Sequence, residues 1–260
     1  MEKDNRFAVL IDADNVSEKY IKFILDEISN DGVATYKRIY GDWTKPAFSM
    51  WKNVLLDYSI TPIQQYGYTT GKNATDSAMI IDAMDILYSN NVEGFCIVSS
   101  DSDFTRLAVR LRESGMFVVG MGEKKTPTPF ISACNKFRYL EVLAQDANPS
   151  ALSTDAADEI DRVEMTPLET IKSAVRTIVQ EISDDDGRAF VGELGNMLVR
   201  RYPDFDVRNY GFRKLTPLLK SMEIFDIYSE RNSDGYNKLV YVKEKSNANP
   251  PRLKIQKGLK

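Results

Sequence analysis

Short apolar runs alternate with amphipathic stretches along the first 143 residues of this 260-residue chain. The run at residues 7–11 contains only Phe, Ala, Val, Leu and Ile, which indicates a buried strand. The stretch at 18–29 places Ile21, Ile24 and Ile28 on one face of a helix. Strands that alternate with helices form a mainly parallel sheet covered by helices, so the sequence predicts an α/β fold. We expect strands at residues 7–12, 33–40, 60–66, 94–98, 116–121 and 136–141, and helices at 18–29, 46–57, 74–89, 104–112 and 129–134.

Aspartates stand where two of these predicted strands end. Asp12 and Asp14 follow the first strand, and Asp101 and Asp103 follow the strand at 94–98. In an open parallel sheet, ligands bind beyond the carboxyl ends of the strands, where the strand order reverses. If the two strands are neighbours, both pairs of aspartates open into one crevice. Asp76, in the first turn of its predicted helix, is expected to point toward the sheet and to join them.

The chain contains no histidine and only two cysteines, Cys96 and Cys134, which we expect to be reduced core thiols. This composition excludes histidine-based catalysis and zinc sites built from cysteine and histidine. Two carboxylates about 5 Å apart repel by roughly 3 kcal/mol at an effective dielectric of 20. A hard cation relieves that repulsion, so the aspartates together predict a site for Mg²⁺ or Mn²⁺. Taken singly, each aspartate also has a structural interpretation, as a helix cap for Asp103 or a turn residue for Asp14.

Composition divides the rest of the chain. Residues 144–165 carry six acids against one base, which is typical of a flexible acidic linker after a first domain at 1–143. Residues 166–245 carry 13 acids and 13 bases and read as three helices, at 168–181, 190–202 and 208–222, followed by a hairpin of strands at 224–228 and 238–242. This is the element order of a winged helix. The basic tail at 246–260 is expected to be disordered.

Several motifs of the first domain occur together in order. They are VLIDADN at 9–15, YGDW at 40–43, GKNATD at 71–76 and VSSDSDF at 98–104. This set resembles the NYN domain, and more narrowly its bacterial LabA-like branch. The resemblance implies a PIN-like fold and a metal-dependent ribonuclease. It also implies that Asp12, Asp76, Asp101 and Asp103 are the acidic metal-site residues, with Asp14, Asn15 and Ser99 as polar supports and Lys72 as a phosphate contact.

The second domain carries its own resemblance. FVGELG at 190–195 and PDFDVRNYGFRKL at 203–215 are similar to the OST-HTH or LOTUS domain, a winged helix thought to bind RNA. Basic and aromatic side chains recur along the predicted third helix, a combination that suits phosphates and unstacked bases of single-stranded RNA. The candidate RNA-binding residues are Arg208, Tyr210, Arg213, Lys214 and Lys220.

The leading interpretation is therefore a cytoplasmic, metal-dependent ribonuclease with an RNA-binding C-terminal module. We expect no membrane segment and no signal peptide, while homo-oligomers or protein partners, through the linker or the C-terminal domain, remain open. One alternative is a haloacid dehalogenase-type phosphatase with Asp12 as nucleophile and Asp14 as acid, although Asn15 replaces the glycine usual there. The other alternative is a non-catalytic RNA-binding adaptor whose aspartates hold a structural ion.

Overall fold

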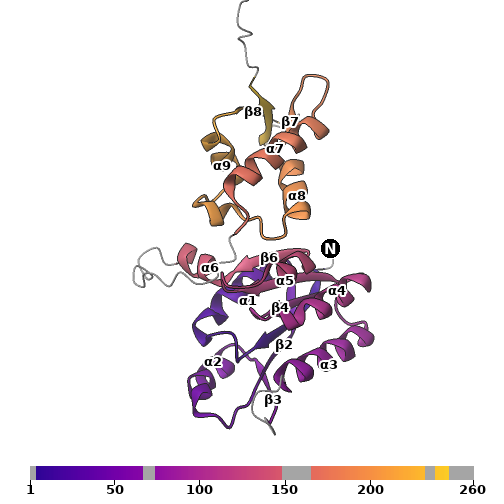
Figure 1. Cartoon of the computed structure of the whole chain (residues 1–260), viewed down its shortest axis with the longest axis vertical. Helices are drawn as coiled ribbons and strands as arrows, with labels where there is room; N and C mark the ends of the chain where they lie inside the picture. The colour runs from indigo at the N-terminus through magenta and orange to yellow at the C-terminus, as the bar shows by residue number, and fades with distance from the viewer. Residues whose placement is uncertain (1–3, 67–73, 148–164, 232–237, 246–260) are drawn as a thin grey trace, which may run out of the picture. The chain divides into compact units, whose positions relative to one another are not determined.

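The computed structural model describes residues 4–66, 74–147, 165–231 and 238–245 (Figure 1). The chain forms two compact units, which are described separately. The first consists of Met1–Leu168 and Leu198–Gly211, and the second of Glu169–Met197 and Phe212–Lys260. Lys72, most of the expected linker and the expected tail lie outside the described residues.

A six-stranded parallel sheet forms the centre of the first unit, in the order β3-β2-β1-β4-β5-β6. The order reverses beside β1, which pairs with β2 on one side and with β4 on the other. This pairing confirms the expected α/β architecture and makes the strands before Asp12 and Asp101 neighbours. The strands are β1 (Arg6–Asp12), β2 (Val33–Gly41), β3 (Thr61–Gln64), β4 (Gly94–Val98), β5 (Phe117–Gly122) and β6 (Lys136–Tyr139).

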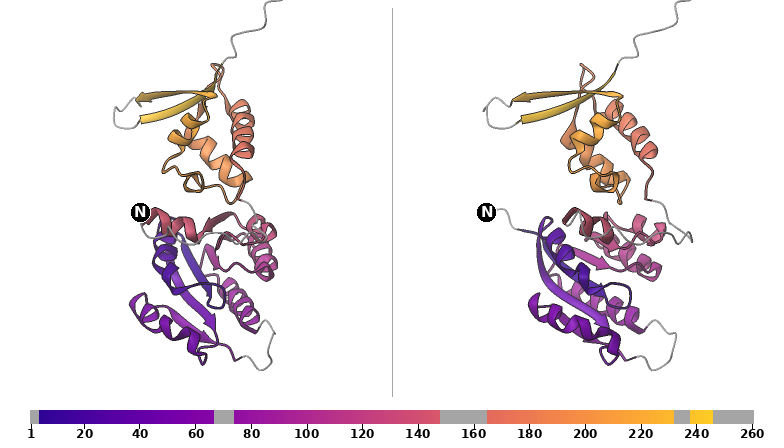
Figure 2. Two further views of the ribbon diagram at one scale, coloured as in Figure 1. Left: turned by 60° about the vertical axis from the view of Figure 1, so that its left-hand side comes forward. Right: turned by 90° about the vertical axis from the view of Figure 1, so that its left-hand side faces the viewer.

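Helices cover both faces of the sheet, and Figure 2 shows the resulting layers of the first unit. Alternate residues of β1 divide between the two cores. Ala8 and Leu10 pack in the core beneath α3 (Ala74–Ser89), α4 (Thr105–Glu113) and α5 (Thr128–Ala133). Val9 and Ile11 pack on the other side, beneath α1 (Ile21–Ser29), α2 (Trp51–Asp57) and α6 (Leu140–Ala147). Successive side chains of a strand point to opposite faces of the sheet, and this alternation determines the face on which each strand-end side chain lies.

Helix boundaries differ from the sequence prediction in recognisable ways. Three of the expected helices begin with a 3₁₀ turn, at Glu18–Tyr20, Pro46–Met50 and Ser102–Phe104. The last predicted strand ends early because α6 starts at Leu140 and buries Leu140 and Leu143 against the second core. Cys96 and Cys134 are buried and free, as expected.

The C-terminal region combines helices with a small antiparallel sheet of order β7-β9-β8. The prediction of one continuous helix at 208–222 is wrong. A 3₁₀ turn at Val207–Tyr210 ends at Gly211, whose φ of +79° is left-handed. The chain becomes helical again only at α9 (Leu215–Ser221). The remaining elements are α7 (Leu168–Ile182), β7 (Ala189–Phe190), α8 (Val191–Arg201), β8 (Phe225–Arg231) and β9 (Lys238–Glu244).

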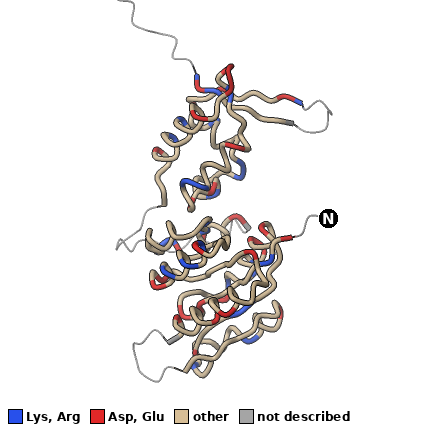
Figure 3. The backbone as a smooth tube through the Cα atoms, turned by 90° about the vertical axis from the view of Figure 1, so that its right-hand side faces the viewer, with Lys and Arg blue, Asp and Glu red and all other residues tan. Residues whose placement is uncertain are grey.

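Charges of both signs are interspersed along the described backbone, as Figure 3 shows, in keeping with a net charge of −4. Among the described residues, none of the helices combines the length and apolar composition that crossing a bilayer requires.

Candidate functional site

Asp12 ends β1 on the face that Ala8 and Leu10 share, which is the face covered by α3. Its side chain is fully buried. Both carboxylate oxygens accept hydrogen bonds: Oδ2 from Asn15 Nδ2 (2.7 Å) and Ser99 Oγ (2.8 Å), and Oδ1 from the backbone N–H of Asp14 (3.1 Å). Burial raises the pKa of Asp12, and these hydrogen bonds oppose that rise. The side chain is therefore held in one orientation at the end of the strand.

Ser99 reaches Asp12 because β1 and β4 are neighbours in register, with Ile11 opposite Val98. The same Ser99 hydroxyl accepts a hydrogen bond from the backbone N–H of Asp101 (3.1 Å), which fixes the turn after β4. Gly122, at the end of β5, allows this arrangement, since a Cβ there would lie 2.6 Å from the Ser99 carbonyl oxygen. The sequence-predicted supports Asn15 and Ser99 thus both contact Asp12.

Three further carboxylates converge beside this strand end. Asp76, Asp101 and Asp103 each present an oxygen such that the three atoms lie within 4.8 Å of one another. Asp76 comes from the first turn of α3, Asp101 caps the 3₁₀ turn after β4, and Asp103 lies within that turn. Asp101 Oδ1 also accepts the backbone N–H of Asp103 at 2.9 Å. Asp12 is not a member of this group of three, although it is near enough to influence Asp76.

The convergence of the carboxylates changes the pKa of Asp76. Burial, followed by the charges of Asp12, Asp101, Asp103 and Asp14, raises the pKa of Asp76 to about 6. Its side chain is only 9% exposed. Like charges that hinder one another's ionisation are the situation that a bound cation relieves. Carboxylate oxygens at this spacing suit the ligand preferences of Mg²⁺ or Mn²⁺, which bind oxygen donors at about 2.1 Å.

Asp14 lies at the exposed rim of the cluster and has two partners that the sequence did not indicate. Thr75 Oγ1 donates a hydrogen bond to Asp14 Oδ2 (2.9 Å), and Lys45 Nζ lies 3.8 Å from Asp14 Oδ1. Thr75 precedes Asp76 in the GKNATD motif, which was the available signal. Lys45 lies 31 residues further along the chain from Asp14, and no local pattern joins them.

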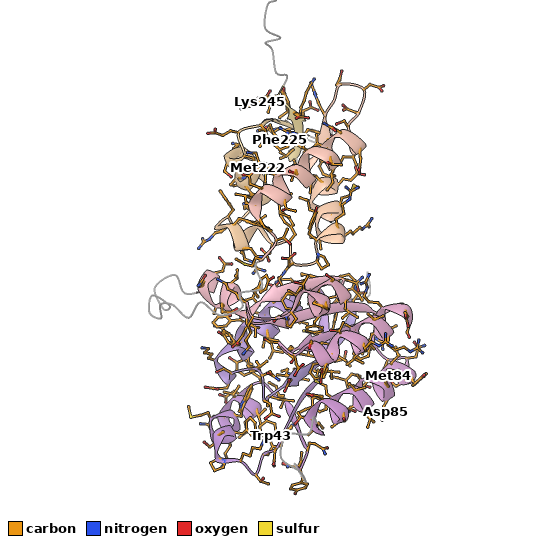
Figure 4. The ribbon with its side chains drawn as sticks, viewed as in Figure 1. Trp43, Met84, Asp85, Met222, Phe225 and Lys245 are labelled. Carbon is orange, nitrogen blue, oxygen red and sulfur yellow. The ribbon has the colours of Figure 1, made fainter. Side chains whose placement is uncertain are left out.

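Two further aspartates of α3, Asp82 and Asp85, lie outside the cluster and differ in their surroundings. Asp85 is exposed on α3 (Figure 4). Asp82 instead forms an ion pair with Arg38 of β2 and accepts a hydrogen bond from the Tyr40 hydroxyl. Burial and the Asp82 carboxylate both raise the pKa of the Tyr40 hydroxyl, which remains protonated. This pairing joins α3 to the sheet close to the aspartates.

The candidate RNA-binding residues do not share one helix. Arg208 donates to Asp206 through Nε (3.1 Å) and Nη2 (2.6 Å), and the Tyr210 hydroxyl donates to the Thr166 carbonyl (2.8 Å). These two half-buried residues belong to the first unit. Arg213, Lys214 and Lys220 belong to the second unit and are exposed.

Comparison with known proteins identifies both regions. The NYN domain matches residues 6–141, and the OST-HTH/LOTUS domain matches residues 166–236. The chain therefore belongs to the NYN family, whose domain is part of the PIN-like nuclease superfamily. Membership of the LabA-like branch stays a prediction.

Two solved structures are distantly similar to this chain. A crystal structure of a protein of unknown function from Vibrio parahaemolyticus is 16% identical, with a TM-score of 0.44, over 54% of this chain and 94% of its own. A solution structure of an uncharacterised protein from Nitrosomonas europaea is 28% identical, with a TM-score of 0.28, over 39% of this chain and 94% of its own. Among curated proteins, none matches the sequence.

Proposed function

We propose that this chain is a metal-dependent ribonuclease that hydrolyses phosphodiester bonds of single-stranded RNA, with its OST-HTH/LOTUS domain as an RNA-binding module. The observation that carries the proposal is the convergence of Asp76, Asp101 and Asp103 within 4.8 Å at the carboxyl edge of an NYN-domain sheet. Nuclease activity accords with the superfamily to which this domain belongs.

Each side chain has a defined part in this proposal. Asp76, Asp101 and Asp103 would hold Mg²⁺ or Mn²⁺, which when bound lowers the pKa of a water ligand and stabilises charge on a phosphate. Asp12 adds negative charge from the buried side, with its carboxylate fixed by Asn15 and Ser99. Asp76 must release its proton to bind a cation, so its raised pKa makes the site weaker at acidic pH.

RNA affinity is assigned to the exposed cations of the second unit, Arg213, Lys214 and Lys220. Lysine and arginine contacts to phosphates supply affinity without sequence preference. The equal numbers of acids and bases in residues 166–245 keep this term modest. Arg208 and Tyr210, which are engaged by Asp206 and Thr166, are weaker candidates than the sequence indicated.

The phosphatase alternative fits the site poorly. A nucleophilic aspartate needs an oxygen free to attack, whereas both oxygens of Asp12 accept hydrogen bonds and the side chain is fully buried. The adaptor alternative differs from the nuclease only in chemistry, so the same cleavage assay decides between them.

The test is cleavage of a fluorescent single-stranded RNA by the full-length protein in Mn²⁺, in Mg²⁺ and in EDTA. Asp101→Asn should abolish the activity, whereas Asp85→Asn, an exposed aspartate on α3 outside the cluster, should retain it. Equal cleavage in EDTA and in Mn²⁺ would refute metal dependence. Divalent-cation binding without cleavage by the wild-type protein would favour the adaptor.

A further inference from the structure

An aromatic cleft lies beside the loop that follows β2, and Lys45 of this loop approaches Asp14 at the rim of the acidic cluster. The YGDW motif continues from β2 into a cleft of about 580 Å³, which is large enough for a small ligand. Figure 4 shows Trp43 in this part of the first unit. The lining combines aromatic, aliphatic and cationic side chains; those that matter here are Trp43, Lys45, Phe48, Lys52 and Leu56.

Hydrogen bonds hold the aromatic wall of the cleft in place. The Trp43 indole N–H donates to the Ile63 carbonyl (3.0 Å), and its backbone N–H donates to Gln64 Oε1 (3.0 Å). Gln64 Nε2 in turn donates to Asp42 Oδ1 (2.9 Å). The Trp43 and Phe48 rings lie 5.4 Å apart at an interplanar angle of 55°. The wall is therefore preorganised, so a ligand that stacks on it does not have to order it first.

Contacts between neighbouring loops connect the cleft to Asp14, at the rim of the acidic cluster. The backbone N–H of Ala13, between Asp12 and Asp14, donates to the Tyr40 carbonyl at 3.0 Å. Gly41 lies so close that a Cβ there would be 3.2 Å from Ala13 Cβ and 3.7 Å from Phe48 Cε2. Lys45, which lines the cleft, has its ammonium 3.8 Å from Asp14.

We infer that this cleft is a subsite for one nucleotide of single-stranded RNA next to the bond that is cleaved; the inference rests on the proposed function. The base stacks on Trp43 and Phe48, while Lys45 and Lys52 neutralise the phosphates on either side of it. Each base offers a π-face, so such a subsite binds RNA with little sequence preference. Two lysines at an aromatic cleft complement a polyanion, whereas an apolar peptide would offer neither of them an anionic partner.

Tryptophan fluorescence tests this subsite in the full-length protein. Both tryptophans of the chain, Trp43 and Trp51, lie in the NYN domain, so RNA bound only to the second domain leaves their emission unchanged. Trp51 is 3% exposed and lies outside the cleft lining. Titration in EDTA separates binding from the proposed chemistry. Hexaadenylate RNA should quench the emission, and a ribose-phosphate hexamer without bases should bind about tenfold more weakly, the factor that one stacked base supplies.

Substitutions identify the residues that are responsible for the fluorescence quenching. Trp51→Phe should keep the quenching and Trp43→Phe should remove it. Phe48→Leu should weaken hexaadenylate binding at this site but leave the abasic hexamer unchanged. Lys45→Gln with Lys52→Gln should weaken both ligands, and Lys22→Gln, an exposed lysine on α1, should weaken neither.

Three outcomes would overturn the inference. The first is equal affinity for the normal and abasic hexamers. The second is metal-dependent cleavage of RNA without any Trp43 quenching, which would leave the proposed function standing. The third is Trp43 emission that changes with protein concentration and not with RNA, which would place a second copy of the chain on the cleft. Quenching without cleavage would instead support base stacking in the cleft but would remove the proposed function, and with it the position of the subsite next to a cleaved bond.

Discussion

The sheet edge of the NYN domain and the turn at Val207–Tyr210 arrange their charges in opposite ways. At the sheet edge, Asp76, Asp101 and Asp103 bring like charges together, and the pKa of Asp76 rises to about 6. At the turn, buried Asp206 is matched by Arg208 through short hydrogen bonds. A pair of opposite charges is complete without a ligand, whereas a group of like charges is costly until a cation binds. Only the first arrangement therefore indicates a site for chemistry.

The largest effect should come from removing a charge at the sheet edge. Asp12→Asn should lower the cleavage rate by at least about a hundredfold, since it withdraws charge and a hydrogen-bond acceptor from the buried side of the site. Single-turnover kinetics with saturating Mn²⁺ measure the rate. A rate within about threefold of the wild type would show that Asp12 is structural.

At the turn, a charge deletion should instead reduce stability. Arg208→Ala should lower the free energy of unfolding by about 1–3 kcal/mol, because the buried carboxylates of Asp206 and Glu27 would both lose their hydrogen bonds from Arg208, although Arg138 Nε would stay 3.1 Å from Asp206. Lys214→Ala, at an exposed position, should stay within about 0.5 kcal/mol of the wild type. Urea unfolding measures both changes. If Arg208→Ala were neutral in stability but weakened RNA binding, the original assignment of Arg208 to RNA would be correct.

The pH dependence of stability tests the charge repulsion at Asp76. Because its folded pKa of about 6 lies above its unfolded value, the folded state retains a proton that the unfolded chain releases, and stability falls as pH rises from about 4 to 6. The Asp76→Asn variant has no such carboxylate and does not lose this stability. Without metal, its free energy of unfolding should exceed that of the wild type by about 1–2 kcal/mol at pH 7.5, allowing for solvent screening, and by little at pH 4.

Thermal unfolding in EDTA across this pH range makes the measurement, with Asp85→Asn as the control. Added Mn²⁺ should reverse the order at pH 7.5, because it stabilises only a protein that binds it. An Asp76→Asn advantage that is the same at pH 4 and pH 7.5 would contradict the proposed charge repulsion.

The sequence was informative where short-range periodicity determines the outcome. The apolar runs at 7–11 and 95–98 were enough to predict strands that end at the aspartates, whereas the part of Ser99 was implied only by the resemblance to the NYN domain. It was uninformative where partners are distant in the chain, as for Lys45 with Asp14 or Arg38 with Asp82, because no local pattern encodes such pairs.

The C-terminal region shows a different reason for error. The basic residues from 208 to 220 occur at helical spacing, yet Gly211 adopts a left-handed conformation and divides the segment. A glycine within a helical pattern permits either outcome, and tertiary packing decides between them. The predicted domain boundaries and the winged-helix arrangement stay predictions.

The smallest effect should come from the exposed cations of the second unit. The triple variant Arg213→Ala, Lys214→Ala, Lys220→Ala should weaken RNA binding and reduce the slope of log affinity against log salt by roughly 0.7 for each phosphate interaction that is removed. Cleavage should show a raised KM with kcat unchanged, because these side chains bind substrate and transition state equally. Salt titrations from about 50 to 300 mM, the range over which phosphate interactions weaken steeply, and steady-state kinetics measure the two quantities.

A fall in kcat at saturating RNA with an unchanged KM would mean that the C-terminal cations help to build the active site. In that case the division between a domain that reacts and a domain that binds would be wrong.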